Sequence, residues 1–185
     1  MNKQSKSISR LPRLEEPLED ALLAETFAGI RARGAALWNI HRVSGHAPRL
    51  FAATARYAGA LRNDVSLPQA LREMVILRTA QVAESAYEQS VHRSIALKCG
   101  VSAAKIAALT AWRDSPLFDE RERAVLAYTD QAAKDGNVDD PTFAALRRLY
   151  SPQEIVELTA TIAWYTGNAR FTKALRIAPE EDGAG

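Results

Sequence analysis

The stretch LREMVILRTAQVAESAYEQSVHRSIALKCG, residues 71–100, determines the architecture predicted for this chain. Its apolar residues recur at helical spacing and do not alternate as in a strand, which predicts one helix over Leu67–Ala83 and another over Ser85–Lys98. The first helix has apolar side chains on nearly all sides, which is typical of a helix at the centre of a bundle. Since no strand pattern of useful length occurs elsewhere, the sequence predicts an all-α fold.

The second predicted helix carries polar residues on its apolar side. Ser85, Glu88 and His92 are spaced by three and then four residues, so they share the inward stripe that also holds Val91. On the preceding helix, Glu73 lies in an apolar arc, where its carboxylate needs a partner or a raised pKa. A short connection between the two helices would fold them together and bring Glu73 toward the stripe.

The same periodicity predicts further helices on both sides of this pair, over Leu18–Arg33, Ala35–Val43, Pro48–Arg62, Ala103–Ala111, Glu120–Lys134, Thr142–Leu149 and Ser151–Thr166, with a last one from Asn168. Gly100 can take the left-handed position that ends a helix, and Ser102 can cap the next one. Ser151, Pro152 and Glu154 resemble a capping box with proline at the first helical position.

The length of 185 residues suits a single domain, which we place at residues 18–177. Residues 1–17 and 178–185 are polar or rich in proline and glycine, and they lack an apolar helical period. We therefore expect a mobile tail at each end. The hydrophobic share of 47% and the charged share of 25% are typical of a globular protein.

Charge and hydropathy exclude some classes of function. A net charge of +2, from 24 basic and 22 acidic residues, argues against nucleic-acid binding. Neither a secretory signal nor an apolar run of about 18 residues occurs, so we expect a cytoplasmic protein without a membrane span. The single cysteine, Cys99, excludes an intrachain disulfide and fits a reducing compartment.

A family resemblance becomes specific at the two central helices. The stretch from Leu71 to Leu109 resembles the core motif of the carboxymuconolactone decarboxylase family, which includes alkylhydroperoxidase D. LWNIHRVSGHAPRLF (Leu37–Phe51) and YTGNARFTKAL (Tyr165–Leu175) resemble the flanks of longer members. In the peroxidase branch the pattern is a glutamate, a Cys-x-x-Cys pair and a histidine four residues after the second cysteine. The resemblance covers roughly residues 18–177.

The chain departs from the peroxidase pattern at the cysteines. Glu73 and His92 match its acid and its histidine, whereas Ser85 and Glu88 stand where its two cysteines would be. Neither serine nor glutamate can pass through a sulfenic acid to a disulfide, so thiol peroxidase activity is not expected. Cys99 lies about 10 Å along the helix from His92, too far to substitute, and its simplest role is that of a small core residue.

The decarboxylase branch carries a glutamate and a histidine four apart, as Glu88 and His92 are here. This resemblance implies acid–base chemistry in which His92 delivers or removes a proton, Glu88 orients His92 or shares the proton, and Glu73 tunes both. Ser85 and Tyr87 complete the set of candidate catalytic residues, Tyr87 as a donor to a developing oxyanion. The structural alternatives are a hydrogen-bonded core histidine, a helix-stabilising pair and an ordinary boundary tyrosine.

Candidate substrate-binding residues are Arg170, Asn168 and His46. The resemblance makes Arg170 a carboxylate anchor, with an interhelical ion pair as the alternative, while His46 could equally be a surface or capping residue. Glu73, Glu88, His92 and His46 could in principle bind a metal, but no zinc-type motif such as HExxH occurs, and we expect neither a metal nor another cofactor.

The resemblance implies helical protomers assembled as a trimer or hexamer. Our leading hypothesis is a lyase that catalyses proton transfer or decarboxylation on a small carboxylated lactone or carbonyl compound. A second hypothesis is a non-catalytic oligomer that binds a small acid in the same pocket. The third is a protein related to the peroxidases by descent only.

Overall fold

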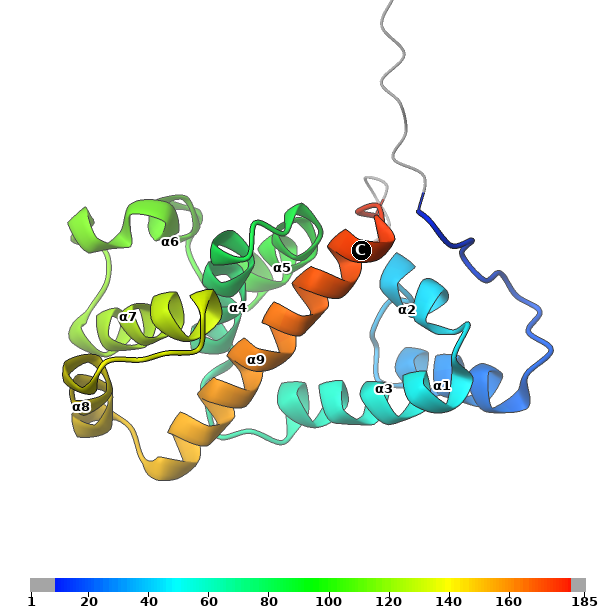
Figure 1. Cartoon of the computed structure of the whole chain (residues 1–185), viewed down its shortest axis with the longest axis horizontal. Helices are drawn as coiled ribbons and strands as arrows, with labels where there is room; N and C mark the ends of the chain where they lie inside the picture. Colours follow the sequence, from blue (N-terminus) through cyan, green and yellow to red (C-terminus); the bar gives the residue numbers. More distant parts are fainter. Residues whose placement is uncertain (1–8, 181–185) are drawn as a thin grey trace, which may run out of the picture.

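The computed structural model describes residues 9–180, and within that range every regular element is helical (Figure 1). In chain order the elements are α1 (Ala21–Ala32), α2 (Asn39–Ser44), α3 (Pro48–Asn63), α4 (Gln69–Val82), α5 (Ala86–Lys98), α6 (Ala103–Ala108), the 3₁₀ helix η1 (Leu109–Asp114), α7 (Glu120–Lys134), α8 (Asp140–Leu149) and α9 (Pro152–Leu175). This confirms the all-α fold predicted from the sequence.

Helix α4 lies at the centre of the larger group of helices, packed against α5, α7 and α9. Its apolar residues divide between two cores: Val75 packs in the cluster that contains Ile162 of α9, and Met74 and Leu77 pack in the cluster that contains Leu126 of α7. All five side chains are nearly or fully buried. The helix is therefore apolar nearly all round because it has neighbours nearly all round.

Helix α9 crosses the molecule diagonally between two groups of helices, α4–α8 on one side and α1–α3 on the other (Figure 1). It contacts α4 in the first group and α3 in the second. The smaller group has its own core, in which Phe27 of α1 meets Phe51 of α3 edge to face, with ring centroids 5.9 Å apart. This arrangement leaves α2, α3, α5 and α9 around a common space.

Capping explains why several helices begin where the sequence predicts. Ser151 and Asp119 each form a capping box at the starts of α9 and α7, and Ser102 accepts a hydrogen bond from the main-chain N–H of Lys105 in α6. Gly100 follows α5 with a φ of 91°, a left-handed conformation that favours glycine. These predicted helix boundaries are confirmed.

Other predicted boundaries are wrong. The expected break before Asn168 does not occur, because α9 continues through Gly167 to Leu175. One glycine inside a helix costs only about 1 kcal/mol, and the burial of Tyr165 and Ala169 on either side supports the helix across it. At the other end of the chain α1 begins at Ala21, where Asp20 caps it, instead of at Leu18.

Both expected tails contact the domain where the structure describes them. Arg10 donates main-chain and side-chain hydrogen bonds to the carbonyls of Leu175 and Ala174, and the carboxylate of Glu180 accepts one from the main-chain N–H of Asn39. Residues 1–8 and 181–185 lie outside the described range, so the mobility of the tails stays a prediction. None of the helices between residues 9 and 180 has the length and apolar character needed to span a lipid bilayer.

Candidate active site

Three ionisable side chains meet between α4 and α5, and we call Glu73, His92 and Glu88 the Glu88 cluster. Nδ1 of His92 lies 2.7 Å from Oε2 of Glu73, and Nε2 of the same ring lies 3.6 Å from Oε2 of Glu88. Glu73 and His92 are 2% exposed and Glu88 is 3% exposed. The convergence anticipated from the inward stripe is therefore present in the structure.

The local structure explains how these groups are positioned. Glu84, with a φ of 52°, forms the tight turn that reverses the chain between α4 and α5. Ser85 then caps α5, since its Oγ accepts a hydrogen bond from the main-chain N–H of Glu88 at 3.3 Å. Glu88 and His92 follow one turn apart on the face packed against α4, and Glu73 approaches from that helix.

The two carboxylates of the cluster differ in their hydrogen bonding. A carboxylate can only accept hydrogen bonds, so an ionised Glu73 places a proton on Nδ1 of His92 and leaves Nε2 turned toward Glu88. Oε1 of Glu88, in contrast, is buried with no hydrogen-bond partner among the described residues. Burial raises the pKa of Glu88 to about 6, and the neighbouring His92 counteracts this only in part. Glu88 is thus poised to exchange a proton near neutral pH.

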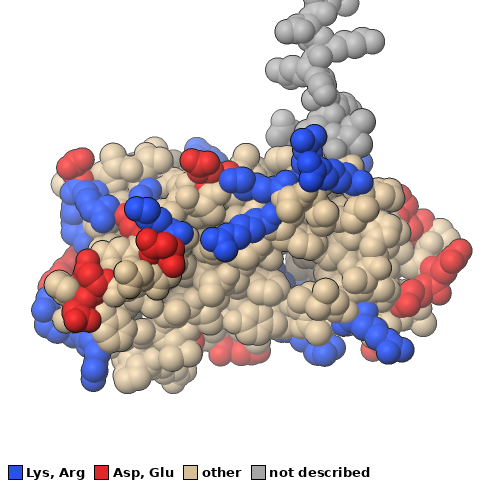
Figure 2. Space-filling view, in the orientation of Figure 1, with Lys and Arg blue, Asp and Glu red and all other residues tan. Residues whose placement is uncertain are grey.

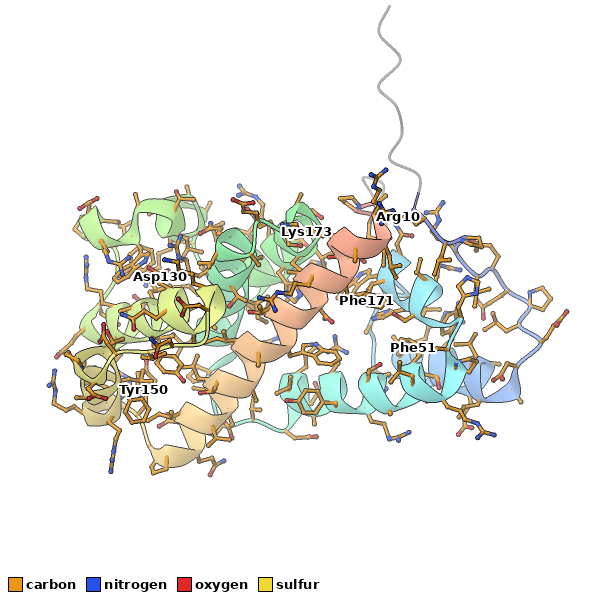
Figure 3. The ribbon with its side chains drawn as sticks, in the orientation of Figure 1. Arg10, Phe51, Asp130, Tyr150, Phe171 and Lys173 are labelled. Carbon is orange, nitrogen blue, oxygen red and sulfur yellow. The ribbon has the colours of Figure 1, made fainter. Side chains whose placement is uncertain are left out.

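A cavity of about 480 Å³ lies against the cluster, and Glu88 and His92 form part of its wall. Figure 2 shows the surface hollowed beside α9, and Figure 3 places Phe171 of α9 and Phe51 of α3 on either side of this space. Most of the remaining wall is apolar or aromatic, including Ile30, Trp38, Ile40, Val43, Leu50, Val91, Trp164, Tyr165 and Leu175. Such a lining suits a small, flat and largely apolar ligand.

Two tyrosines, Tyr87 and Tyr165, line the cavity, and neither has an easily lost proton. The Tyr87 hydroxyl accepts a hydrogen bond from the N–H of Ile40 at 3.1 Å and donates one to Glu180 at 3.0 Å. Burial raises the pKa values of Tyr87 and Tyr165 far above their usual range. Tyr165 packs edge-on against His92, with ring centroids 4.8 Å apart, and so restricts the imidazole.

The predicted binding residues separate in the structure. Asn168 and His46 line the cavity, and His46 is held by a 2.9 Å contact between Nε2 and the carbonyl of Pro12. Arg170 does not line it: its exposed side chain lies in a separate depression formed with Lys134 and other residues. The described chain therefore does not place Arg170 in the wall of this cavity, and its role as a carboxylate anchor stays a prediction. Ser85 is also outside the lining.

The sequence analysis missed Arg62, which lines the cavity from the last turn of α3. A signal for it was present, since Phe51, Ala55, Ala58 and Arg62 recur at the spacing of one helical face. His41 also lines the cavity, and its pKa is lowered to about 4, mainly by burial and further by the charge of Arg62. His41 is therefore uncharged at neutral pH.

The arrangement within the cluster does not favour a metal. Glu73 and Glu88 lie against opposite nitrogens of His92, so the three groups cannot surround one ion as they stand. Within the described range 9–180, no three or more histidine, cysteine, aspartate or glutamate side chains are arranged so that they could hold one metal ion. Cys99 ends α5 outside the cavity wall, and burial raises the pKa of its thiol, which opposes formation of the thiolate.

Comparisons with known proteins identify the family of the chain. The model of the carboxymuconolactone decarboxylase family matches residues 48–131. The uncharacterized protein YnjA of Escherichia coli strain K12 is 32% identical over 136 residues, which cover 72% of this chain and 74% of YnjA.

Solved structures share the fold at lower identity. A peroxidase-related protein from Ralstonia eutropha JMP134, described as an alkylhydroperoxidase AhpD core, superposes with a TM-score of 0.77 at 23% identity and covers 95% of this chain and 94% of its own. A variant of the debrominase Bmp8 in complex with 2,3,4-tribromopyrrole gives a TM-score of 0.80 at 24% identity, over 91% of this chain and 90% of its own. With its AhpD-like helical fold and its match to YnjA, the chain belongs to the carboxymuconolactone decarboxylase family.

Proposed function

We propose that this protein is an acid–base enzyme in which Glu88 exchanges the proton with the substrate. The observation that carries the proposal is that Glu88 lines an apolar cavity while its buried Oε1 has no hydrogen-bond partner among the described residues. A pKa of about 6 lets the same carboxyl act as acid and as base near neutral pH. His92 and Glu73 stand behind Glu88 and relay and orient the proton.

The proposed substrate is a small carboxylated lactone or carbonyl compound, and the reaction is a decarboxylation or a proton shift next to the carbonyl. In the decarboxylation, the bond to the carboxylate breaks, CO₂ leaves, and its electron pair passes into the carbonyl as an enolate. Protonated Glu88 then donates its proton to the carbon. Solvent protons restore Glu88 through Nε2 of His92, while Glu73 holds Nδ1.

Two features support a ring compound as the substrate. The cavity is bounded by aromatic side chains, among them Trp38, Phe51 and Trp164, which suit a flat ring. The debrominase Bmp8, a neighbour in fold, is known in complex with a small ring, 2,3,4-tribromopyrrole. Thiol peroxide reduction is not proposed, because the single cysteine lies outside the cavity wall and two thiols are needed.

We also propose that the protein acts in the cytoplasm as a homo-oligomer. Exposed apolar side chains around the cavity mouth, Leu50 and Phe171 among them, support self-association. Light scattering coupled to size-exclusion chromatography measures the oligomer, and a strictly monomeric protein would contradict this part of the proposal.

The experiment is a screen of β-keto acids and carboxylated γ-lactones that follows CO₂ release and, in D₂O, deuterium incorporation by NMR. For any compound that the wild type turns over, Glu88→Gln and His92→Ala should each reduce kcat/KM by at least about 100-fold. Glu25→Gln, which changes an exposed glutamate of α1, is the control and should leave kcat/KM unchanged. Unchanged turnover in Glu88→Gln would reject the proposal, and binding without turnover across the screen would favour the non-catalytic binder.

A further inference from the structure

Arg62 is the cation of the cavity. It occupies the last turn of α3, its side chain is half-buried, and it is the only lysine or arginine among the described residues that form the cavity wall. Its neighbours along the same helical face, Phe51, Ala55 and Ala58, are apolar and line the same cavity. The charge of Arg62 thus stands at one end of an apolar surface.

No protein group neutralises this charge in the described part of the chain. The ion pairs of lysine and arginine side chains within residues 9–180 involve other residues, namely Arg31, Arg42, Arg78, Lys105, Arg113 and Arg121. None of its side-chain nitrogens is both buried and unpartnered, so the guanidinium donors are open to the solvent and to a ligand in the cavity. An anionic ligand in the cavity would supply the missing partner.

Arg62 is the only residue of the described cavity wall with a permanent positive charge, because the other basic residues there are histidines. His41 also lines the cavity, but it is uncharged at neutral pH. Arg62 and Glu88 both form part of the wall of this cavity. A ligand held at Arg62 would therefore share the cavity with Glu88.

We propose that Arg62 is the specificity-determining residue of the cavity and binds the carboxylate of a small, flat, monoanionic ring compound. A guanidinium suits this role because it can hold a carboxylate through two parallel hydrogen bonds. This inference rests on the proposed function, because Arg62 can select a substrate only if the protein catalyses the proposed reaction. Arg62 replaces Arg170, which lies in a different depression.

The test measures binding and needs no turnover. The probes are benzoate and its neutral isostere benzamide, titrated into wild-type protein, Arg62→Gln, Arg62→Lys and the control Arg56→Gln, which changes an exposed arginine of α3 outside the cavity. Trp38 and Trp164 line the cavity, so their fluorescence reports occupancy. Far-UV circular dichroism checks that each variant is folded.

The expected result is that the wild type and Arg56→Gln prefer benzoate to benzamide. Arg62→Gln should weaken benzoate binding by at least about tenfold and leave benzamide binding unchanged, whereas Arg62→Lys should retain part of the preference. Equal losses for both probes would show that Arg62 only shapes the wall and would overturn the inference. A wild type with no preference for benzoate, including one that binds neither probe at millimolar concentration, would overturn it as well.

These outcomes are distinct from those of the turnover screen. A cavity that selects benzoate through Arg62 but never releases CO₂ or exchanges a proton supports the anion site and counts against the enzymatic proposal. Turnover that depends on Glu88 but is indifferent to Arg62 supports the acid–base proposal and overturns this inference.

Discussion

Helix α4 contributes to two polar groupings, one partly buried and one fully buried, that differ in how completely their hydrogen-bonding atoms are satisfied. Arg78 binds Asp130 of α7 with Nε 2.5 Å from Oδ1, while Oδ2 of Asp130 accepts hydrogen bonds from Trp112 and Arg113. We call these four residues the Asp130 network. One and a half turns earlier on α4, Glu73 joins the Glu88 cluster, where one carboxylate oxygen has no partner. Asp130 and Phe51, beside the cavity, lie on opposite sides of α9 (Figure 3).

This contrast indicates a structural role for the Asp130 network and a chemical role for the Glu88 cluster. Both oxygens of Asp130 are occupied by donors from η1 and α4, so the network joins three elements and has no free position for a ligand. Glu88 is more deeply buried, has an unfilled acceptor and faces a cavity. Because unsatisfied buried polar atoms are costly, their retention marks a candidate site for function.

The largest expected effect on stability comes from Asp130→Ala. Removing this carboxylate takes the charged partner from Arg78 and the hydrogen-bond acceptor from Trp112, which should lower the free energy of unfolding by about 3 kcal/mol. Urea denaturation measures the change, and Asp114→Ala, at an exposed aspartate of η1, is the control. Benzoate binding should persist while the variant is folded. A change below about 0.5 kcal/mol would mean that the network does not stabilise the fold.

Removal of the Glu88 carboxylate is expected to change the free energy of unfolding in the opposite direction above pH 6, where the ionised group destabilises the folded protein. Its pKa is higher in the folded protein, about 6 against an ordinary 4.5, so the folded state binds this proton more tightly. This contribution to stability is complete below pH 4.5 and is lost as the pH rises to about 6. The wild type should therefore lose about 2 kcal/mol of unfolding free energy across that window relative to Glu88→Gln.

The measurement is urea denaturation of both proteins at a series of pH values, taken as a difference to remove the titration of other groups. Glu25→Gln, at an exposed position on α1, should give a flat difference from the wild type. A flat difference for Glu88→Gln too would show that the Glu88 carboxyl is well solvated, and the contrast with Asp130 would fail.

The parts of the fold that local sequence patterns determine could be predicted. The helix Glu120–Lys134 was predicted with the observed bounds because its apolar period ends in a turn. The break before Asn168 was wrong because a glycine is a weak signal that tertiary packing of α9 overrides. Glu73, Glu88 and His92 were brought together correctly, since one tight turn between adjacent helices suffices to place them.

The rest of the site depends on contacts between distant segments. Whether Arg62 or Arg170 enters the cavity is decided by how α3 and α9 rotate against each other, and periodicity within either helix cannot show that. The same holds for the hydroxyl of Tyr87, which contacts Glu180, 93 residues away. The capping role of Ser85, in contrast, was readable from its position before a helix, although the family comparison drew attention to it as a chemical group.

Ser85→Ala tests which of those two roles is correct. Loss of the cap should lower the free energy of unfolding by about 1 kcal/mol, as should Ser102→Ala at the start of α6. If Ser85 only caps α5, benzoate binding and any turnover should stay within about twofold of wild type in both variants. A loss of turnover confined to Ser85→Ala, with stability unchanged, would place Ser85 within the chemistry of the Glu88 cluster.

The smallest effect on stability is expected at Gly167. Comparing it with a helical glycine outside the cavity distinguishes an effect on the cavity wall from an effect on the helix. A Cβ at Gly167 or at Gly59 of α3 would meet no atom within 4 Å, and both residues are helical. Each change to alanine should therefore raise the free energy of unfolding by about 0.5–1 kcal/mol. Only Gly167 lines the cavity, so only Gly167→Ala should alter benzoate binding. Destabilisation by Gly167→Ala alone would mean that α9 is not regular there, and that the helix break expected from the sequence has a physical basis.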